Sequence, residues 1–198
     1  MTTLLLRIAA AQYDIGYFAD WNDYERKVES WVERAVANGA QLLLWPEYAS
    51  LELVSLFNGE VQKSLTLQLQ QIQSLRDKFL QLHDALAKKH GLYILPGTFP
   101  LRLESGEYRN RAWLFGPDGL LGFQDKLQMT RFEREQWFIS AGDQLRVFDT
   151  AFGTLGINIC YDSEFPLLAR RQAEMGAKLI LVPSCTDTLA GHWLVRIA

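Results

Sequence analysis

The 198-residue sequence has little cysteine, little histidine and no surplus of positive charge. Its two cysteines, Cys160 and Cys185, are too few for a disulfide framework, so we expect a reducing compartment, the cytoplasm. With 20 Lys+Arg against 23 Asp+Glu, the chain lacks the basic stripe that nucleic acid or an anionic membrane requires. The three histidines lack metal-ligand spacing and no glycine-rich phosphate loop is present, so we expect neither metal nor cofactor.

Long apolar runs are also missing. The first apolar run is interrupted by Arg7 and lacks the pattern of a signal peptide. No stretch approaches the roughly 20 apolar residues that a membrane span requires. The 48% hydrophobic content is typical of a folded globular chain, and the length predicts a single domain over residues 1–198.

The apolar residues that are present alternate between helical and strand patterns. Apolar spacings of three and four predict helices over residues 24–36 and 72–86, and Pro166 begins a third. Short apolar runs bounded by turn residues predict strands at 4–12, 41–45, 93–99, 112–115, 120–123, 145–148, 154–159 and 178–182. Helix–strand units mixed with hairpins indicate an α/β fold with helices packed on a mixed sheet. Residues 192–198 are predicted to begin a further helix.

Three polar side chains stand where predicted strands end, the position at which layered α/β folds usually build their sites. They are Glu47, Lys126 and Cys160. A thiol is a poor nucleophile until it is deprotonated, so it needs a base and a nearby positive charge. The histidines lie on predicted helix faces or near the C-terminus, which disfavours a Cys–His pair and leaves the carboxylate and the ammonium.

Three segments in this order resemble the catalytic motifs of the nitrilase superfamily, the carbon-nitrogen hydrolases. They are Leu-Trp-Pro-Glu47, Asp-Lys126-Leu-Gln-Met-Thr-Arg-Phe-Glu133 and Gly-Ile-Asn-Ile-Cys160-Tyr-Asp, with Leu-Val-Pro-Ser following. The similarity runs from residue 4 to the end of the sequence. It implies an α-β-β-α sandwich, in which two mixed sheets face each other and helices cover the outer faces. It also implies a homodimer or a higher homo-oligomer.

The resemblance assigns roles to single residues. It implies Glu47 as the general base, Lys126 as the group that stabilises the tetrahedral oxyanion, and Cys160 as the nucleophile that forms a thioester. The backbone N–H of Tyr161 is implied as the second oxyanion donor. Many members use another glutamate after the lysine, for which we choose Glu133.

Several positions near these motifs stay open or receive structural interpretations. Glu135 competes with Glu133 as the second glutamate, and Gln128 stands where many relatives carry histidine. Loops around residues 48–60, 128–138 and 184–190 are expected to set specificity. The last loop supplies three candidate substrate-binding or pocket-wall residues: Ser184, Cys185 and Thr186. Asp162 is interpreted as a structural acid that anchors the loop after Cys160, and Trp45 and Trp137 as core residues.

The leading functional hypothesis is a hydrolase that cleaves a non-peptide C–N bond of a small amide or carbamoyl compound. Cys-Tyr-Asp resembles the amidase and carbamoylase branches, whereas nitrilases more often show Cys-Trp-Glu. A nitrilase is one alternative. The other is a truncated or inactive member that acts as a binding or assembly module, because family members are commonly several tens of residues longer and the chain is expected to lack their C-terminal part. The expected partners are a small amide substrate and a second copy of the chain.

Overall fold

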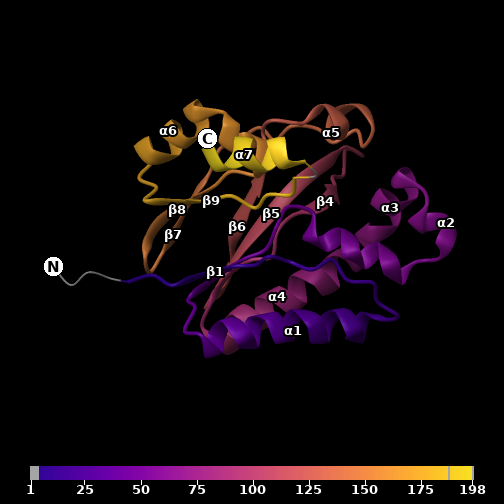
Figure 1. Cartoon of the computed structure of the whole chain (residues 1–198), viewed down its shortest axis with the longest axis horizontal. Helices are drawn as coiled ribbons and strands as arrows, with labels where there is room; N and C mark the ends of the chain where they lie inside the picture. The colour runs from indigo at the N-terminus through magenta and orange to yellow at the C-terminus, as the bar shows by residue number, and fades with distance from the viewer. Residues whose placement is uncertain (1–4, 187, 198) are drawn as a thin grey trace.

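Two β-sheets face each other, and helices cover their outer faces (Figure 1). The computed structural model describes residues 5–186 and 188–197. The first sheet has six strands in the order β1-β2-β3-β5-β4, with β6 also paired to β5. Their bounds are β1 Ile8–Ala10, β2 Leu42–Leu44, β3 Tyr93–Leu95, β4 Phe99–Arg102, β5 Tyr108–Gly116 and β6 Gly119–Asp125. The β1–β2 and β2–β3 pairs are parallel, and the other pairs are antiparallel.

The second sheet is smaller and also mixed. It contains β7 (Val147–Thr150), β8 (Gly153–Ile157) and β9 (Leu179–Leu181) in this order. The β7–β8 pair is antiparallel and the β8–β9 pair is parallel. Two mixed sheets with outer helices confirm the predicted α-β-β-α sandwich.

Side chains of alternate residues fill the two sides of the first sheet, as the two-residue period of a strand requires. Leu42, Leu95 and Leu114 belong to the core between the sheets, together with Leu155 and Ile157 of the second sheet. Their strand neighbours on the opposite face belong to a second core with α1 (Trp21–Ala37) and α4 (Arg76–His90).

Local signals explain where these helices begin and end. The Asp20 side chain caps α1 by accepting from the Asp23 N–H at 3.0 Å. Gly91, at φ +64°, ends α4 in the left-handed conformation that glycine adopts without penalty. On the second sheet, α6 (Pro166–Glu174) starts at Pro166 as predicted, and its Gln172 donates to the Ile157 carbonyl at 3.1 Å.

Other segments differ from the sequence predictions. The strand predicted at 93–99 is two strands, β3 and β4, because the chain turns at Gly97 with φ +70°. A Cβ at this position would lie 2.0 Å from the Pro46 carbonyl oxygen, so only glycine fits. Of the strand predicted at 4–12, residues 8–10 form β1, and residue 4 lies outside the described residues.

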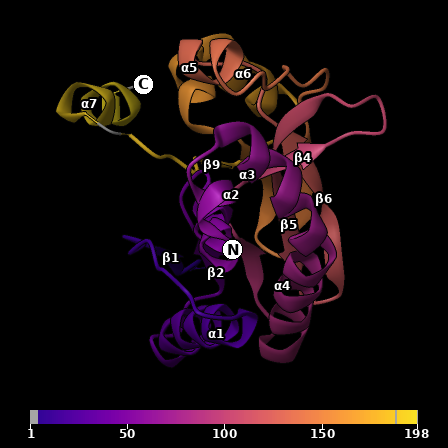
Figure 2. The same ribbon diagram turned by 90° about the vertical axis from the view of Figure 1, so that its right-hand side faces the viewer.

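Short helices that have no clear apolar period were not predicted. They follow β2 and β6, and they are η1 (Ala49–Leu56), α2 (Gly59–Gln62), α3 (Leu65–Gln71) and α5 (Arg131–Glu135). The helix predicted at 72–86 begins with η2 (Ile72–Leu75) and continues as α4. Two further helices are η3 (Cys160–Glu164) and α7 (Leu189–Ile197). α7 contains the helix predicted to begin at 192, and it stands apart from α5 and α6 (Figure 2). None of the helices in the described part of the chain combines the length and apolarity of a membrane span.

Candidate active site

Three loops at the ends of strands bring Glu47, Lys126 and Cys160 together in one cleft. Glu47 follows β2 and Pro46, and the next residue, Tyr48, is fixed by a hydrogen bond from its N–H to Thr98 Oγ1 at 2.8 Å. Lys126 directly follows β6, and its N–H donates to the Asn110 carbonyl at 2.9 Å. Hydrogen bonds to residues in or beside the first sheet therefore fix the backbone next to Glu47 and at Lys126.

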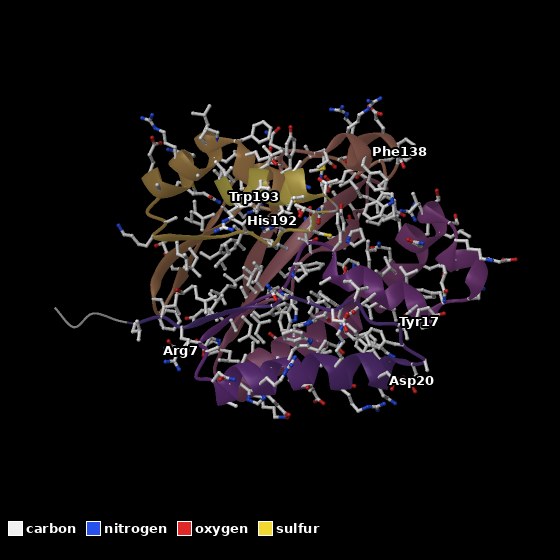
Figure 3. All side chains as sticks on the ribbon, viewed as in Figure 1. Arg7, Tyr17, Asp20, Phe138, His192 and Trp193 are labelled. Carbon is white, nitrogen blue, oxygen red and sulfur yellow. The ribbon has the colours of Figure 1, made fainter. Side chains whose placement is uncertain are left out.

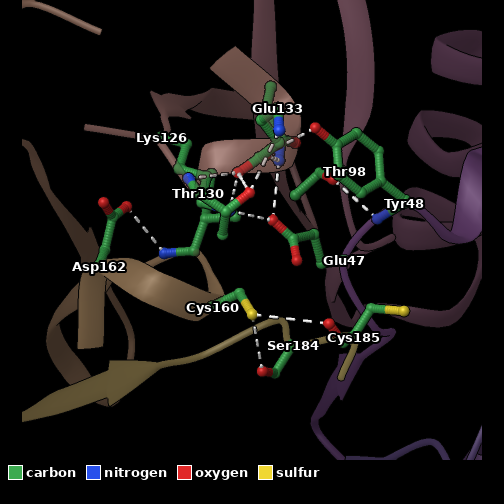
Figure 4. Close-up of polar contacts among 12 residues, drawn as sticks. Glu47, Tyr48, Thr98, Lys126, Thr130, Glu133, Cys160, Asp162, Ser184 and Cys185 are labelled. Carbon is green, nitrogen blue, oxygen red and sulfur yellow. Dashed lines mark hydrogen bonds and ion pairs between the residues drawn. The ribbon is translucent and has the colours of Figure 1, made fainter. Parts of the chain in front are cut away.

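Cys160 occupies a strained turn. It lies at φ +47°, a conformation that residues other than glycine seldom adopt, and its N–H donates to the Pro183 carbonyl at 2.9 Å. The Ser184 hydroxyl donates to Cys160 Sγ at 3.2 Å, and Sγ lies 3.7 Å from the Cys185 carbonyl oxygen (Figure 4). Strain of this kind persists only where the surroundings fix it, and it is found at functional sites.

The Lys126 ammonium is buried between two carboxylates (Figure 4). Nζ donates to Glu47 Oε1 at 2.7 Å and to Glu133 Oε2 at 2.6 Å. All three side chains are at most 4% exposed. Because burial of unpaired charges is costly, each charge in this cluster depends on the others.

Three residues that sequence reasoning missed complete this cluster. Asn110 Nδ2 donates to Glu47 Oε1 at 2.8 Å and to Glu133 Oε1 at 3.0 Å. The Tyr48 hydroxyl donates to Glu133 Oε1 at 2.7 Å, and Thr130 donates to Glu133 Oε2 from its N–H and its hydroxyl. The Thr130–Glu133 spacing is a capping box at the start of α5, a signal that the sequence does contain.

Asp162 makes structural contacts, as predicted, but its carboxylate holds the segments after Lys126 and before Cys160 rather than the loop after Cys160. Its carboxylate accepts from the N–H groups of Leu127 at 3.0 Å, Gln128 at 2.7 Å and Ile159 at 3.1 Å. Burial raises the pKa of Asp162 to about 6, although these hydrogen bonds act in the opposite direction. Asp162 therefore ties the backbone after Lys126 to the backbone before Cys160.

Burial and charge shift the proton affinities of the cluster in different directions. Burial, aided by the Glu133 charge, raises the pKa of Glu47 to about 7, although Lys126 opposes the shift. Burial would also raise the pKa of Glu133, but contact with Lys126 holds it below its ordinary value. Burial alone would lower the pKa of Lys126, yet the two carboxylates raise it. Burial and the Glu47 charge raise the pKa of Cys160 to about 11. At rest, the site therefore favours a thiol beside a carboxyl group of intermediate proton affinity.

The cleft has a volume of about 530 Å³. Its lining consists of Ile15, Glu47, Tyr48, Leu51, Glu52, Lys126, Thr130, Phe132, Glu133, Trp137, Cys160 and Cys185. Trp137 is buried, as predicted, but it also lines the cleft, whereas Trp45 belongs to the core and does not line this cleft. The lining draws on the three loops expected to set specificity and adds four residues that lie outside them: Ile15, Glu47, Lys126 and Cys160.

The other predicted positions lie around this cleft. Glu135 is exposed on α5 and pairs with Arg131 at 2.8 Å, away from Lys126. The Tyr161 ring packs against Phe165 with the ring centroids 5.0 Å apart. Cys185 is exposed and lines the cleft, whereas Thr186 is exposed and is not among the lining residues. Within residues 5–186 and 188–197, no group of three His, Cys, Asp or Glu side chains could hold a metal ion.

Residues 7–196 match the model of the family described as carbon-nitrogen hydrolase. The chain therefore belongs to the carbon-nitrogen hydrolase family, and the resemblance inferred from the sequence motifs is confirmed. This membership agrees with the two-sheet sandwich and with a cleft that combines carboxylate, ammonium and thiol groups.

Similar proteins include hydrolases and amidases. The chain is 37% identical over 191 residues to the probable hydrolase YhcX of Bacillus subtilis, covering 96% of this chain and 36% of that protein. It is 28% identical over 173 residues to the omega-amidase NIT2-B of Xenopus laevis, covering 82% of this chain and 58% of that protein. The chain thus spans between about a third and three fifths of the length of these two curated relatives.

Solved structures show the same fold. A carbon-nitrogen hydrolase from Helicobacter pylori G27 superimposes with a TM-score of 0.77 at 19% identity, over 96% of this chain and 68% of that chain. An amidase from Nesterenkonia sp. AN1 superimposes with a TM-score of 0.68 at 25% identity, over 94% and 70% of the two chains. The latter is a glutamate-to-glutamine mutant that shows the result of Michael addition of acrylamide at its active-site cysteine.

Proposed function

We propose that this cleft hydrolyses the C–N bond of a small amide, with Cys160 as nucleophile, Glu47 as general base and Lys126 as oxyanion donor. The observation that carries the proposal is the buried contact between Glu47 and Lys126 in the cleft that Cys160 also lines. Similarity to amidases, one of which reacts with acrylamide at its active-site cysteine, favours an amide over a nitrile.

Acylation begins with the thiol in its protonated form. Glu47 takes the proton as Cys160 Sγ attacks the amide carbonyl carbon, and the C=O electron pair moves onto oxygen. One carboxylate oxygen of Glu47 contacts Lys126 and Asn110, and the other points toward the side of the site where Cys160 lies (Figure 4). The pKa of about 7 lets Glu47 accept this proton and later return it.

Lys126 stabilises the charge that develops on the tetrahedral oxygen. Its raised pKa keeps the ammonium protonated, so that it donates a hydrogen bond rather than taking up the thiol proton. The N–H of Tyr161, next to the nucleophile, is the second proposed donor. Preorganised donors of this kind contribute roughly 3 kcal/mol each in a site that excludes water.

Collapse of the tetrahedral intermediate completes the first half-reaction. The C–N bond breaks, Glu47 returns its proton to the leaving nitrogen, and ammonia departs from a thioester on Cys160. Glu47 then takes a proton from water, whose hydroxyl attacks the thioester carbon. The C–S bond breaks, the sulfur recovers the proton, and the carboxylic acid is released.

Glu133 acts in this scheme as a positioning residue. Its carboxylate contacts Lys126, Asn110 and Tyr48, so it orients the ammonium and supports the Glu47 side chain through the shared amide. It also supplies the second negative charge that keeps Lys126 protonated.

The test is ammonia release from butyramide by the 198-residue chain and two cysteine variants. Cys160→Ala should abolish release, because no thioester can form, whereas Cys185→Ala should keep most of the activity. Full turnover by folded Cys160→Ala would overturn the mechanism. A folded wild-type chain that releases no ammonia from any small amide would instead support the alternative of a binding or assembly module.

A further inference from the structure

The cleft has an apolar wall that the proposed chemistry does not use. Ile15, Leu51, Phe132 and Trp137 form this wall, and they come from the loop after β1, from η1, from α5 and from the segment after α5. Tyr48 extends it, because its ring packs edge-on against Trp137 with the centroids 4.8 Å apart, while its hydroxyl is held by Glu133. These side chains form the apolar surface that the cleft offers to the acyl group of a substrate.

The charged groups of the same lining are already engaged. Three carboxylates and one ammonium line the cleft, and the ammonium of Lys126 is held by Glu47 and Glu133. The third carboxylate, Glu52, is buried and accepts from the Gly16 N–H at 2.8 Å and from Lys27 Nζ at 2.6 Å. Among the described lining residues, no cation remains to receive a substrate carboxylate.

The two arginines next to Phe132 in the sequence do not add a cation to the lining of the cleft. Arg131 and Arg134 flank Phe132 on α5, but their side chains are 84% and 66% exposed and both pair with Glu135. Neither lines the cleft. A carboxylate that entered the cleft would therefore lose part of its hydration and would meet no unpaired cation among the described lining residues.

We propose that the cleft accepts amides whose acyl group is neutral and apolar, and that it discriminates against amides carrying a second carboxylate. The inference rests on the proposed function and names the substrate class of the same site. Transfer of an alkyl chain from water to the wall of Ile15, Leu51, Phe132 and Trp137 lowers the free energy of binding. A carboxylate in the same place would lose hydration, and no ion pair would compensate for that loss.

Three amides of nearly equal size separate charge from shape. Isocaproamide, succinamide and succinamate end in an isopropyl group, a neutral amide and a carboxylate at the same distance from the scissile bond. We expect kcat/KM for ammonia release to fall in this order, with isocaproamide about tenfold or more above succinamate. Turnover of succinamate equal to or faster than that of isocaproamide would overturn the proposal while leaving the hydrolase mechanism intact.

Alkylation of Cys160 gives a second readout that does not need turnover. Iodoacetamide and iodoacetate differ in charge, and peptide mapping measures the rate of each at Cys160, with glutathione as the reference thiol because Cys185 lines the same cleft. The neutral-to-anionic rate ratio should be about tenfold larger at Cys160 than for glutathione. Equal ratios for Cys160 and glutathione would contradict the proposal, even if no amide is hydrolysed.

A matched pair of variants tests the wall directly. Phe132→Lys places a cation in the lining, whereas Phe138 lies on the same segment, is 71% exposed and does not line the cleft (Figure 3). Phe132→Lys should shift the succinamate-to-isocaproamide ratio toward succinamate by about tenfold, and it should lower the iodoacetamide-to-iodoacetate ratio at Cys160. Phe138→Lys should leave both ratios unchanged. An unchanged pair of ratios in folded Phe132→Lys would overturn the assignment of this wall.

Discussion

At the scale of single residues, the geometry distinguishes two acids that the sequence leaves equivalent. Glu133 is buried in contact with Lys126, and Glu135, two residues later, is an exposed partner of Arg131. The α5 capping box at Thr130 turns the first inward and the second outward. A positioning role therefore belongs to Glu133 in our account.

The matched variants Glu133→Gln and Glu135→Gln test this role. Glu133→Gln removes one of the two charges that hold Lys126, so we expect kcat/KM to fall roughly 100-fold and the free energy of unfolding to fall by about 2 kcal/mol. Glu135→Gln should change neither. Steady-state ammonia assays and denaturant unfolding provide the measurements. A stability loss with unchanged kcat would assign Glu133 a purely structural role.

The pH dependence follows from the pKa of Glu47. As the base must be ionised, kcat/KM should rise about tenfold per pH unit below pH 7 and level off above it, since its pKa is about 7. The contribution of Glu47 to the free energy of unfolding has the opposite pH dependence. Because the folded state binds the Glu47 proton more tightly than the unfolded chain does, this stabilisation is fully present below pH 4.5 and is lost as pH rises through 7. A pH–rate profile with its acid limb near 4.5 would contradict the assignment.

The sequence motifs identified the three residues that meet in the cleft, but not their supporting contacts. Glu47, Lys126 and Cys160 each follow an apolar strand, so an ionisable or nucleophilic side chain is easily recognised at these positions. Asn110 and Tyr48 give no such signal, because their contacts with Glu133 join residues 23 and 85 positions apart. Partners at such separations depend on strand pairing and loop geometry, which one sequence does not reveal.

At the scale of elements, prediction succeeded where an apolar period was long. α1 and the segment of η2 and α4 follow spacings of three and four, with end signals at Asp20 and Gly91, whereas α6 was predicted from its start at Pro166. The helices between β2 and η2 are too short to show a period, and they are held by their caps, including Asn58 and Ser64, and by packing. For these short helices, the capping residues, and not an apolar period, are the sequence feature that indicates a helix.

Gly97 connects an element boundary to the site. Gly97→Ala would place Cβ against the carbonyl of Pro46, the residue before Glu47, at a positive φ. We expect a loss of about 3 kcal/mol of unfolding free energy and a fall in kcat, because Glu47 is displaced. Gly59→Ala, which meets no atom within 4 Å, is the control and should be neutral. Thermal unfolding and ammonia release measure both, and a neutral Gly97→Ala would contradict this coupling.

At the scale of the whole molecule, the sandwich and the cleft depend on both sheets. The first sheet supplies Glu47 and Lys126 and the second supplies Cys160, so the facing core of the two sheets sets their separation. α7 presents exposed apolar side chains, among them Leu194 and Trp193, and Trp193 is labelled in Figure 3. The homo-oligomer expected from the family resemblance stays a prediction.

In the proposed mechanism, Cys160 carries the acyl group during turnover. The direct measurement is the intact mass of the chain, quenched in acid while it turns over butyramide, followed by peptide mapping. We predict one butyryl adduct, located on Cys160, removed by hydroxylamine and absent from Cys160→Ala. Turnover of butyramide without any acyl adduct, or with the adduct on Cys185, would contradict the account.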